Sequence, residues 1–92
     1  LLSVLEHEGT PVGTLWLGLW PERAYVLSVE ADARYRGRGH GRALMLVAEA
    51  QAVAGGKDHI GLHVFAGNGP AERLYESLGY ETTQYHLAKQ LL

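Results

Sequence analysis

The chain has 92 residues, of which 47% are hydrophobic and 20% charged, and its formal net charge at pH 7 is −2. This composition is that of a small globular domain, and the net acidity argues against nucleic-acid binding by the whole surface. Without cysteine, disulfides, thiolate metal sites and a cysteine nucleophile are excluded. We find no apolar run of membrane-spanning length and no signal-peptide pattern, so we expect one cytoplasmic domain over residues 1–92.

The first thirty residues predict three strands. Residues 1–6 and 12–18 read as a hairpin joined by a turn cluster at residues 7–11. Pro21 interrupts the pattern at residues 19–23, because proline cannot donate to a sheet ladder. Residues 24–30 form the third strand, and alternation places Tyr25, Leu27 and Val29 on one face. A strand pattern begins at once at Leu1, so we expect that the chain is the C-terminal part of a longer domain or that leading residues are missing.

A loop rich in glycine and arginine follows at residues 35–42. It holds Arg36, Arg38 and Arg42 next to a helical run, and with Arg34 these make four of the eight basic residues. Glycines let a ligand approach the backbone, a helix start offers unpaired amides, and arginine suits phosphate. The loop therefore predicts a phosphate site. A solvated basic turn is the alternative, and a nucleic-acid contact is weaker because Tyr35 is its only aromatic residue.

The second half of the chain predicts a helix, a strand and a second helix. Residues 41–54 carry apolar Leu44, Val47 and Ala48 at helical spacing, and Gly55 with Gly56 ends that helix. Residues 59–65 read as a fourth strand, so the order implies a right-handed parallel crossover. After a loop at residues 66–70, a short helix has an apolar side of Ala71, Leu74, Tyr75 and Leu78. Residues 80–89 alternate loosely and predict one or two closing strands.

Two motifs resemble the GNAT superfamily of acyl-CoA-dependent N-acetyltransferases. Arg36-Gly37-Arg38-Gly39-His40-Gly41 resembles its Arg/Gln-x-x-Gly-x-Gly/Ala signature, with His40 where an apolar residue is usual. Residues 68–80 resemble its Asn-x-x-Ala-x-x-Leu-Tyr-Glu-x-x-Gly-Phe/Tyr segment. The resemblance covers about residues 24–89 and implies an α/β (α+β) domain. Its fold would be a mixed, splayed β-sheet with two helices, lacking the family's usual N-terminal strand and helices.

The resemblance also implies a coenzyme A site. The loop amides would hold the pyrophosphate, and the matching positions are Arg36, Gly37, Arg38, Gly39, His40, Gly41 and Arg42. The pantetheine arm would lie between two splayed central strands. Strand-edge amides of Val29 and Ala31 would face the arm from one side and Asn68 from the other.

The same resemblance implies catalytic residues. Tyr75, seven residues after Asn68, matches the general acid that protonates the leaving thiolate; its alternative is a core tyrosine. Glu30 and His63 are two candidates for the base. Their alternatives are a solvated strand end and a hydrogen-bonded sheet histidine. The other histidines are scattered without ligand spacing, so no metal site is predicted.

We therefore expect direct N-acetyl transfer from acetyl-CoA to a primary amine. The alternative is a non-catalytic acyl-CoA-binding or interaction domain of the same fold. The acceptor stays open among antibiotics, polyamines, peptide N-termini and lysine. Because the family's N-terminal layer is missing, we also expect that a second copy, forming a homodimer, or another segment covers the exposed apolar face. The expected contacts are Trp16, Leu17 and Leu19 or the strands after Tyr80.

Overall fold

The computed structural model describes residues 1–35, 37–64, 69–83 and 87–92. Its elements are β1 (Leu2–His7), β2 (Thr10–Leu19), β3 (Ala24–Ala31), the 3-10 turn η1 (Ala33–Tyr35), α1 (His40–Ala54), β4 (Ile60–Gly61) and α2 (Gly69–Ser77). The strands β1, β2 and β3 form an antiparallel meander, and β4 adds to β3 in parallel. This mixed sheet with two α-helices confirms the expected fold class. None of the described helices has the length and apolar character needed to cross a membrane.

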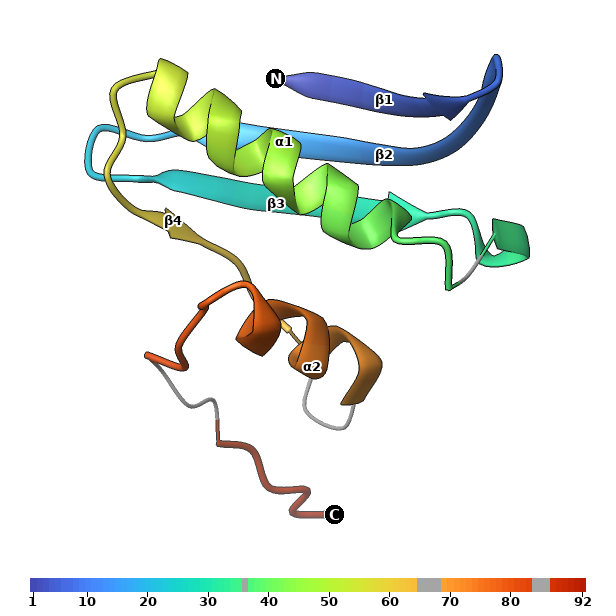
Figure 1. Cartoon of the computed structure of the whole chain (residues 1–92). Helices are drawn as coiled ribbons and strands as arrows, with labels where there is room; N and C mark the ends of the chain where they lie inside the picture. The colour runs from blue at the N-terminus through green and yellow to red at the C-terminus, as the bar shows by residue number, and fades with distance from the viewer. Residues whose placement is uncertain (36, 65–68, 84–86) are drawn as a thin grey trace.

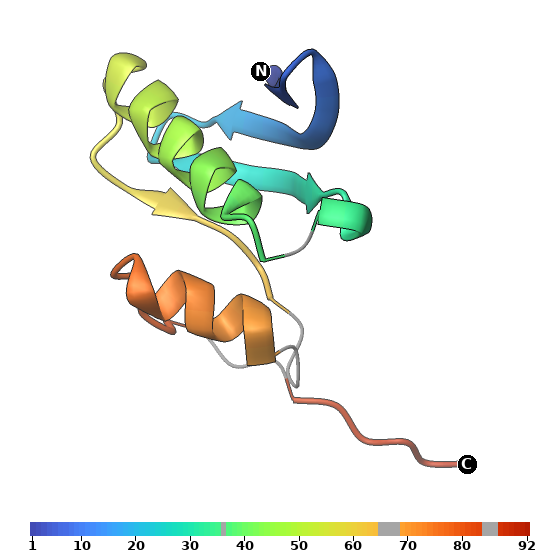
Figure 2. The same ribbon diagram turned by 45° about the vertical axis from the view of Figure 1, so that its right-hand side comes forward.

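The two α-helices occupy different places around the sheet. α1 runs across one face of the meander, and α2 lies beyond β4, on the side away from β3 (Figure 1). The turned view in Figure 2 shows the same separation, with β4 passing between the two helices. The opposite face of the meander is covered by neither helix, so it is open in the described part of the chain.

The first hairpin is tighter than predicted. Its connection is Glu8 and Gly9 alone, both left-handed with φ of 52° and 80°, instead of a five-residue turn. Two successive residues with positive φ match the twist of the flanking strands, so a turn of this kind lets both strands continue up to it. Both strands therefore extend further toward the turn than the pattern predicted.

The core lies between α1 and the meander. It consists of buried apolar side chains from β2, β3 and α1: Leu15, Leu17, Ala24, Val26, Leu44, Met45, Ala48 and Ala52. The prediction of Val47 as an inward residue was wrong, because Val47 is exposed and Met45 is buried in its place. Residues 44–48 are all apolar, so helical spacing alone did not fix which side of α1 faces the sheet.

A bulge in β3 changes which of its side chains face α1. Trp16 pairs with Ser28 and Leu17 pairs with Val26, so Leu27 has no partner across the strands. Because side chains alternate, the extra residue lets Val26 and Val29 both pack toward the core while Leu27 stays 45% exposed. The prediction that Leu27 and Val29 share a face was therefore wrong. Nothing in the alternating pattern signals a bulge.

Alternation along β2 corrects a second expectation. Leu17 is fully buried against α1, so it cannot serve as a contact for a second copy. Trp16 points to the open face and is 54% exposed, next to its cross-strand partner Leu2. The homodimer itself stays a prediction.

The last third of the chain departs from the predicted strands. β4 is only Ile60–Gly61, because the ladder with β3 ends at the pair Tyr25–Gly61 and residues 62–64 continue without a strand partner. Phe65 lies outside the described residues. The described residues 80–83 and 87–92 form no strand, so the predicted closing strands are wrong there; residues 84–86 lie outside the description. A strand needs a neighbouring edge, which alternation in sequence does not supply.

Candidate functional site

The loop before α1 presents bare backbone. Gly37 and Gly39 adopt left-handed conformations with φ of 77° and 79°, which glycine takes without strain. A Cβ atom built on either residue would meet no other atom within 4 Å. The space beside this backbone is therefore open to a ligand. Arg36, the first residue of the predicted cradle, lies outside the described residues.

The first turn of α1 adds amides and a positive dipole end to this loop. Gly39 is the N-cap, and no side chain in the described part of the chain caps the helix there. The ladder begins with the Ala43 N–H, which donates to the Gly39 carbonyl at 2.9 Å. The first turn contains no acidic residue. An uncapped helix start without a neighbouring carboxylate favours an anion.

The arginines around the loop have different interaction partners: a carboxylate, an aromatic ring and a hydroxyl. Arg34 donates to the Asp32 carboxylate at 2.8 Å, and this bond lowers the pKa of Asp32 to about 2. Arg38 lies over the Tyr35 ring, 5.4 Å from its centre. Arg42 donates to the Ser77 hydroxyl of α2 at 3.1 Å. Arg34 is thus occupied by a carboxylate, so of the described arginines in the basic cluster Arg38 and Arg42 are the ones without an acidic partner.

His40 and Gly41 have surroundings that the motif did not predict: both are partly enclosed by neighbouring elements. The Nε2 atom of His40 is buried and has no hydrogen-bond partner among the described residues. A Cβ atom on Gly41 would lie 3.3 Å from Leu74 Cδ2, so the small size of Gly41 lets α2 pack against the start of α1. Gly41 therefore has a packing role that the motif alone did not indicate.

The outer edge of β3 is unpaired next to this loop. The Asp32 N–H donates to the Val12 carbonyl at 2.8 Å, so after the bulge the even-numbered residues bond toward β2. Backbone groups alternate in direction along a strand, which turns Val29 and Ala31 toward the opposite side. β4 no longer pairs with β3 at that level, so these two residues lie on an open edge within the described chain. Asn68, the predicted partner across the opening, lies outside the described residues.

Where β3 and β4 part, a side-chain contact joins them. The Tyr25 hydroxyl shares a hydrogen bond with His63 Nδ1 and lies 3.3 Å from Nε2, with the ring centres 5.5 Å apart. His63 is exposed, so solvent reaches it. Tyr25 belongs to neither of the two motifs in the sequence. Its one distinguishing feature in the sequence is that it is an aromatic residue in a strand otherwise rich in small and aliphatic residues.

The two candidate bases lie apart. Glu30 is exposed near the end of β3, opposite Thr14. It is five residues from Tyr25, about 17 Å at the rise of a strand, whereas His63 contacts Tyr25 directly. The structure therefore does not bring Glu30 and His63 into one catalytic group.

Tyr75, the predicted acid, lies half-buried on α2. Its ring packs edge-on against Tyr80 at 5.9 Å, and burial raises the pKa of its hydroxyl. No hydrogen bond or ring contact among the described residues joins Tyr75 to His63 or Glu30. Tyr80, the last residue of the second motif, donates to Glu49 Oε2 at 2.8 Å and so ties the end of α2 to α1.

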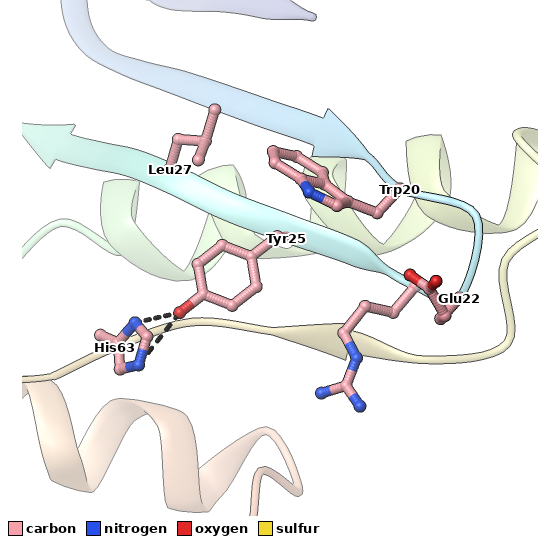
Figure 3. A pocket seen from close by; sticks show the side chains of 6 residues that line it. Trp20, Glu22, Tyr25, Leu27 and His63 are labelled. Carbon is pink, nitrogen blue, oxygen red and sulfur yellow. Dashed lines mark hydrogen bonds between the residues drawn. The ribbon is translucent and has the colours of Figure 1, made fainter. Parts of the chain in front are cut away.

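A pocket of about 370 Å³ opens beside the contact between Tyr25 and His63. Figure 3 shows it on the sheet face opposite α1, with the Tyr25 hydroxyl directed at the His63 ring. Its lining residues are Trp20, Glu22, Arg23, Tyr25, Leu27 and His63.

The mixed sheet, the glycine loop at a helix start and the parted strands agree with the class of protein that the comparisons show. Residues 1–80 match the sequence model of the Acetyltransferase (GNAT) family, so the chain belongs to this family. This confirms the resemblance inferred from the two motifs.

The individual relatives are acetyltransferases by name. The chain is 32% identical over 95 residues to the uncharacterized N-acetyltransferase YycN of Bacillus subtilis, covering 99% of this chain and 61% of that protein. Its crystal structure superposes with a TM-score of 0.86. The ribosomal-protein-S18-alanine N-acetyltransferase of Escherichia coli is 30% identical with a TM-score of 0.81, over 90% of this chain and 54% of that one.

A third relative was solved with a ligand. The putative streptothricin acetyltransferase of Bacillus anthracis, in complex with acetyl coenzyme A, is 26% identical with a TM-score of 0.78. The match covers 85% of this chain and 45% of that one. The chain spans about three fifths of the length of the curated Bacillus relatives that it matches.

Proposed function

We propose that this chain transfers the acetyl group of acetyl-CoA directly to a primary amine. The observation that carries the proposal is the juxtaposition of two open backbone surfaces. One is the glycine loop at the uncapped start of α1, and the other is the unpaired edge of β3 that leads into it. The acetyltransferase names of the relatives support the same activity.

Acetyl-CoA fits the chemistry of these two surfaces. Its pyrophosphate suits the amides after Gly37 and Gly39 and the positive end of α1. The guanidinium of Arg38, which has no acidic partner among the described residues, can donate to a pyrophosphate oxygen. The amide groups of the pantetheine arm can pair with the open strand edge at Val29 and Ala31, as an added strand would.

The proposed reaction needs no covalent enzyme intermediate. The lone pair of the neutral amine forms a bond with the thioester carbonyl carbon, and the carbon–sulfur bond breaks with its electron pair moving to sulfur. Tyr75 donates a proton to the thiolate, and Glu30 or His63 accepts the proton that the amine nitrogen loses. The products are an acetamide and the free thiol of coenzyme A.

A pair of matched glycine variants tests the cradle. Gly39 and Gly56 have nearly equal φ of 79° and 78°, and a Cβ on either meets no atom within 4 Å, but they lie at opposite ends of α1. Gly39→Leu and Gly56→Leu should therefore cost similar backbone strain, about 1–2 kcal/mol. Only Gly39→Leu should abolish coenzyme A binding in calorimetry. Equal affinity in both variants would reject the cradle.

The same preparation separates the enzyme from a non-catalytic acyl-CoA-binding domain. Acetyl-CoA is incubated with a panel of primary amines, and release of the free thiol is followed with a chromogenic disulfide reagent. Amine-dependent thiol release supports the transferase. Tight coenzyme A binding without thiol release from any amine would favour the binding domain.

A further inference from the structure

The pocket on the open face of the sheet lies beside the place where β3 and β4 separate. It surrounds the row of residues where the ladder between β3 and β4 ends, with Tyr25 paired to Gly61. Beyond this row the two strands separate, and His63 stands at the boundary in contact with Tyr25. A molecule in the pocket would therefore lie next to the opening assigned above to the thioester arm (Figure 3).

Two glycines create the space for the pocket's aromatic walls. Gly18 is the partner of Tyr25 on β2, and a Cβ there would lie only 1.5 Å from Cζ3 of Trp20. Gly61 is the partner on β4, and a Cβ there would lie 3.4 Å from the Tyr25 ring. Because neither neighbour carries a side chain, the Trp20 and Tyr25 rings lie against the sheet surface.

The resulting wall is a series of rings. Trp20 lies 6.2 Å from Tyr25, and Tyr25 lies 5.5 Å from His63, measured between ring centres. Leu27, which the bulge leaves on this face, completes the apolar surface. Such a wall suits a planar apolar group, and ring faces also attract a single cation.

The charges at the pocket are balanced. The hairpin turn between β2 and β3 is closed by the Trp20 N–H, which donates to the Arg23 carbonyl at 2.9 Å, and it carries Glu22 and Arg23 side by side. The lining thus holds one carboxylate and one guanidinium. A polyamine or an aminoglycoside carries several ammonium groups and needs several carboxylates. One carboxylate cancelled by a neighbouring arginine does not attract such polycations.

We propose that this pocket binds the aromatic ring of the acceptor, and that the acceptor is an arylalkylamine with one primary amino group. The proposal rests on the transferase function proposed above. The ring of the acceptor packs against Trp20, Tyr25 and Leu27. Its amino group reaches past His63 to the opening between β3 and β4.

Binding is measured without acetyl-CoA, so the result does not depend on turnover. Tryptamine, 2-phenylethylamine and spermidine are titrated into the full chain by calorimetry. The two arylalkylamines should bind saturably and at least tenfold more tightly than spermidine. Trp20→Ala should weaken tryptamine binding at least tenfold, because it removes the largest ring of the wall.

Trp16→Ala is the matched control. Trp16 is also an exposed tryptophan on the same sheet face, but it does not line the pocket. Its substitution should leave tryptamine affinity within twofold. Leu27→Ala offers a second pocket variant at an exposed position and should weaken binding severalfold if Trp20→Ala does not fold.

Arg23→Glu tests the charge argument by gain of function. It raises the lining from one carboxylate to two and removes the guanidinium, so spermidine affinity should rise at least tenfold relative to tryptamine. Preference of the parent chain for spermidine, equal effects of Trp16→Ala and Trp20→Ala, or absence of any saturable amine binding would overturn the proposal. Coenzyme A affinity, measured separately, would stand in each of these cases and keeps failure of the pocket distinct from failure of the transferase.

Discussion

Tyr75 packs against a neighbouring ring and also carries a hydroxyl that could protonate the leaving thiolate. It contacts the Tyr80 ring, and burial raises the pKa of its hydroxyl above the ordinary value near 10. A phenol in that state is protonated throughout the neutral range. It can therefore act as a proton donor at neutral pH. Donation to a departing thiolate also requires that the sulfur lie within hydrogen-bond distance of the hydroxyl.

Replacement of Tyr75 by phenylalanine separates these two roles. Tyr75→Phe retains the ring and removes the hydroxyl, so kcat for acetyl transfer should fall by about 10²–10⁴-fold, with coenzyme A affinity nearly unchanged. Steady-state thiol release measures kcat, and calorimetry measures the affinity. Tyr80→Phe is the control, since it removes a neighbouring hydroxyl that is bonded to Glu49 and should leave kcat within severalfold. Equal turnover of Tyr75→Phe and the parent would reduce Tyr75 to a packing residue.

At the scale of elements, α2 is held to α1 by side chains. Arg42 donates to Ser77, Gly41 admits Leu74, and Tyr80 donates to Glu49. Burial and, next, the Glu49 hydrogen bond raise the pKa of Tyr80 above its usual range. The bond therefore stabilises the fold at neutral pH. Its contribution is present below about pH 10, the unperturbed value, and is lost as pH rises above it.

A double-mutant cycle measures the coupling free energy of the hydrogen bond between Tyr80 and Glu49. Tyr80→Phe, Glu49→Gln and the double variant are unfolded in denaturant at pH 7, and the coupling free energy should be about 1 kcal/mol. Above about pH 10 the Tyr80 hydroxyl ionises in the unfolded chain while the folded chain still holds its proton. The stabilisation from this bond, and with it the coupling free energy, should therefore decline. A coupling near zero at pH 7 would mean that α2 is held by other contacts.

Elements with strong local signals could be predicted from the sequence. The third strand and the first helix were placed within one residue at each end, because turn residues and glycines mark their limits. The place of the fourth strand could be predicted but its length could not, and the closing strands could not, since a strand forms only where another edge accepts it. The bulge at Leu27 was likewise invisible, because it is defined by the pairing of β3 with β2.

For the whole molecule, stability depends on a small core. The buried apolar side chains of the described residues come from only three elements, β2, β3 and α1. A domain of this size buries a modest share of its surface, so each of these side chains is a large part of the net stability.

A cavity in this core should be costly. Leu15→Ala removes a fully buried side chain at the centre of the layer and should lower the free energy of unfolding by about 2–5 kcal/mol. Val53→Ala removes a similar side chain that is 72% exposed on α1, and its effect should stay within about 0.5 kcal/mol. Denaturant titration of both variants compares them directly. Similar losses would show that the layer between α1 and the sheet is not the stabilising core.

The two parts of the site differ in how far the sequence could predict them. The proposed cradle is local, since glycines with positive φ and the helix start follow one another in the chain, so the sequence alone could propose residues 36–42. The pocket joins the turn at Trp20 to His63, and its central contact spans 38 residues of sequence. Only the register of β3 and β4 brings those residues together, so no motif predicts the pocket.

The short ladder between β3 and β4 has a consequence for how the molecule opens. β2, β3 and α1 share the buried core, whereas no residue of α2, all of which the structure describes, is buried. Residues of β4 and α2, such as Ile60 and Tyr75, pack against that core only as partly buried side chains. We therefore expect β4 and α2 to open at a lower free energy than the whole chain unfolds. A co-substrate that bridged the cradle and the β3 edge while touching α2 would hold these elements closed. Binding would then be linked to completion of the fold, and occupied molecules would open less often than empty ones.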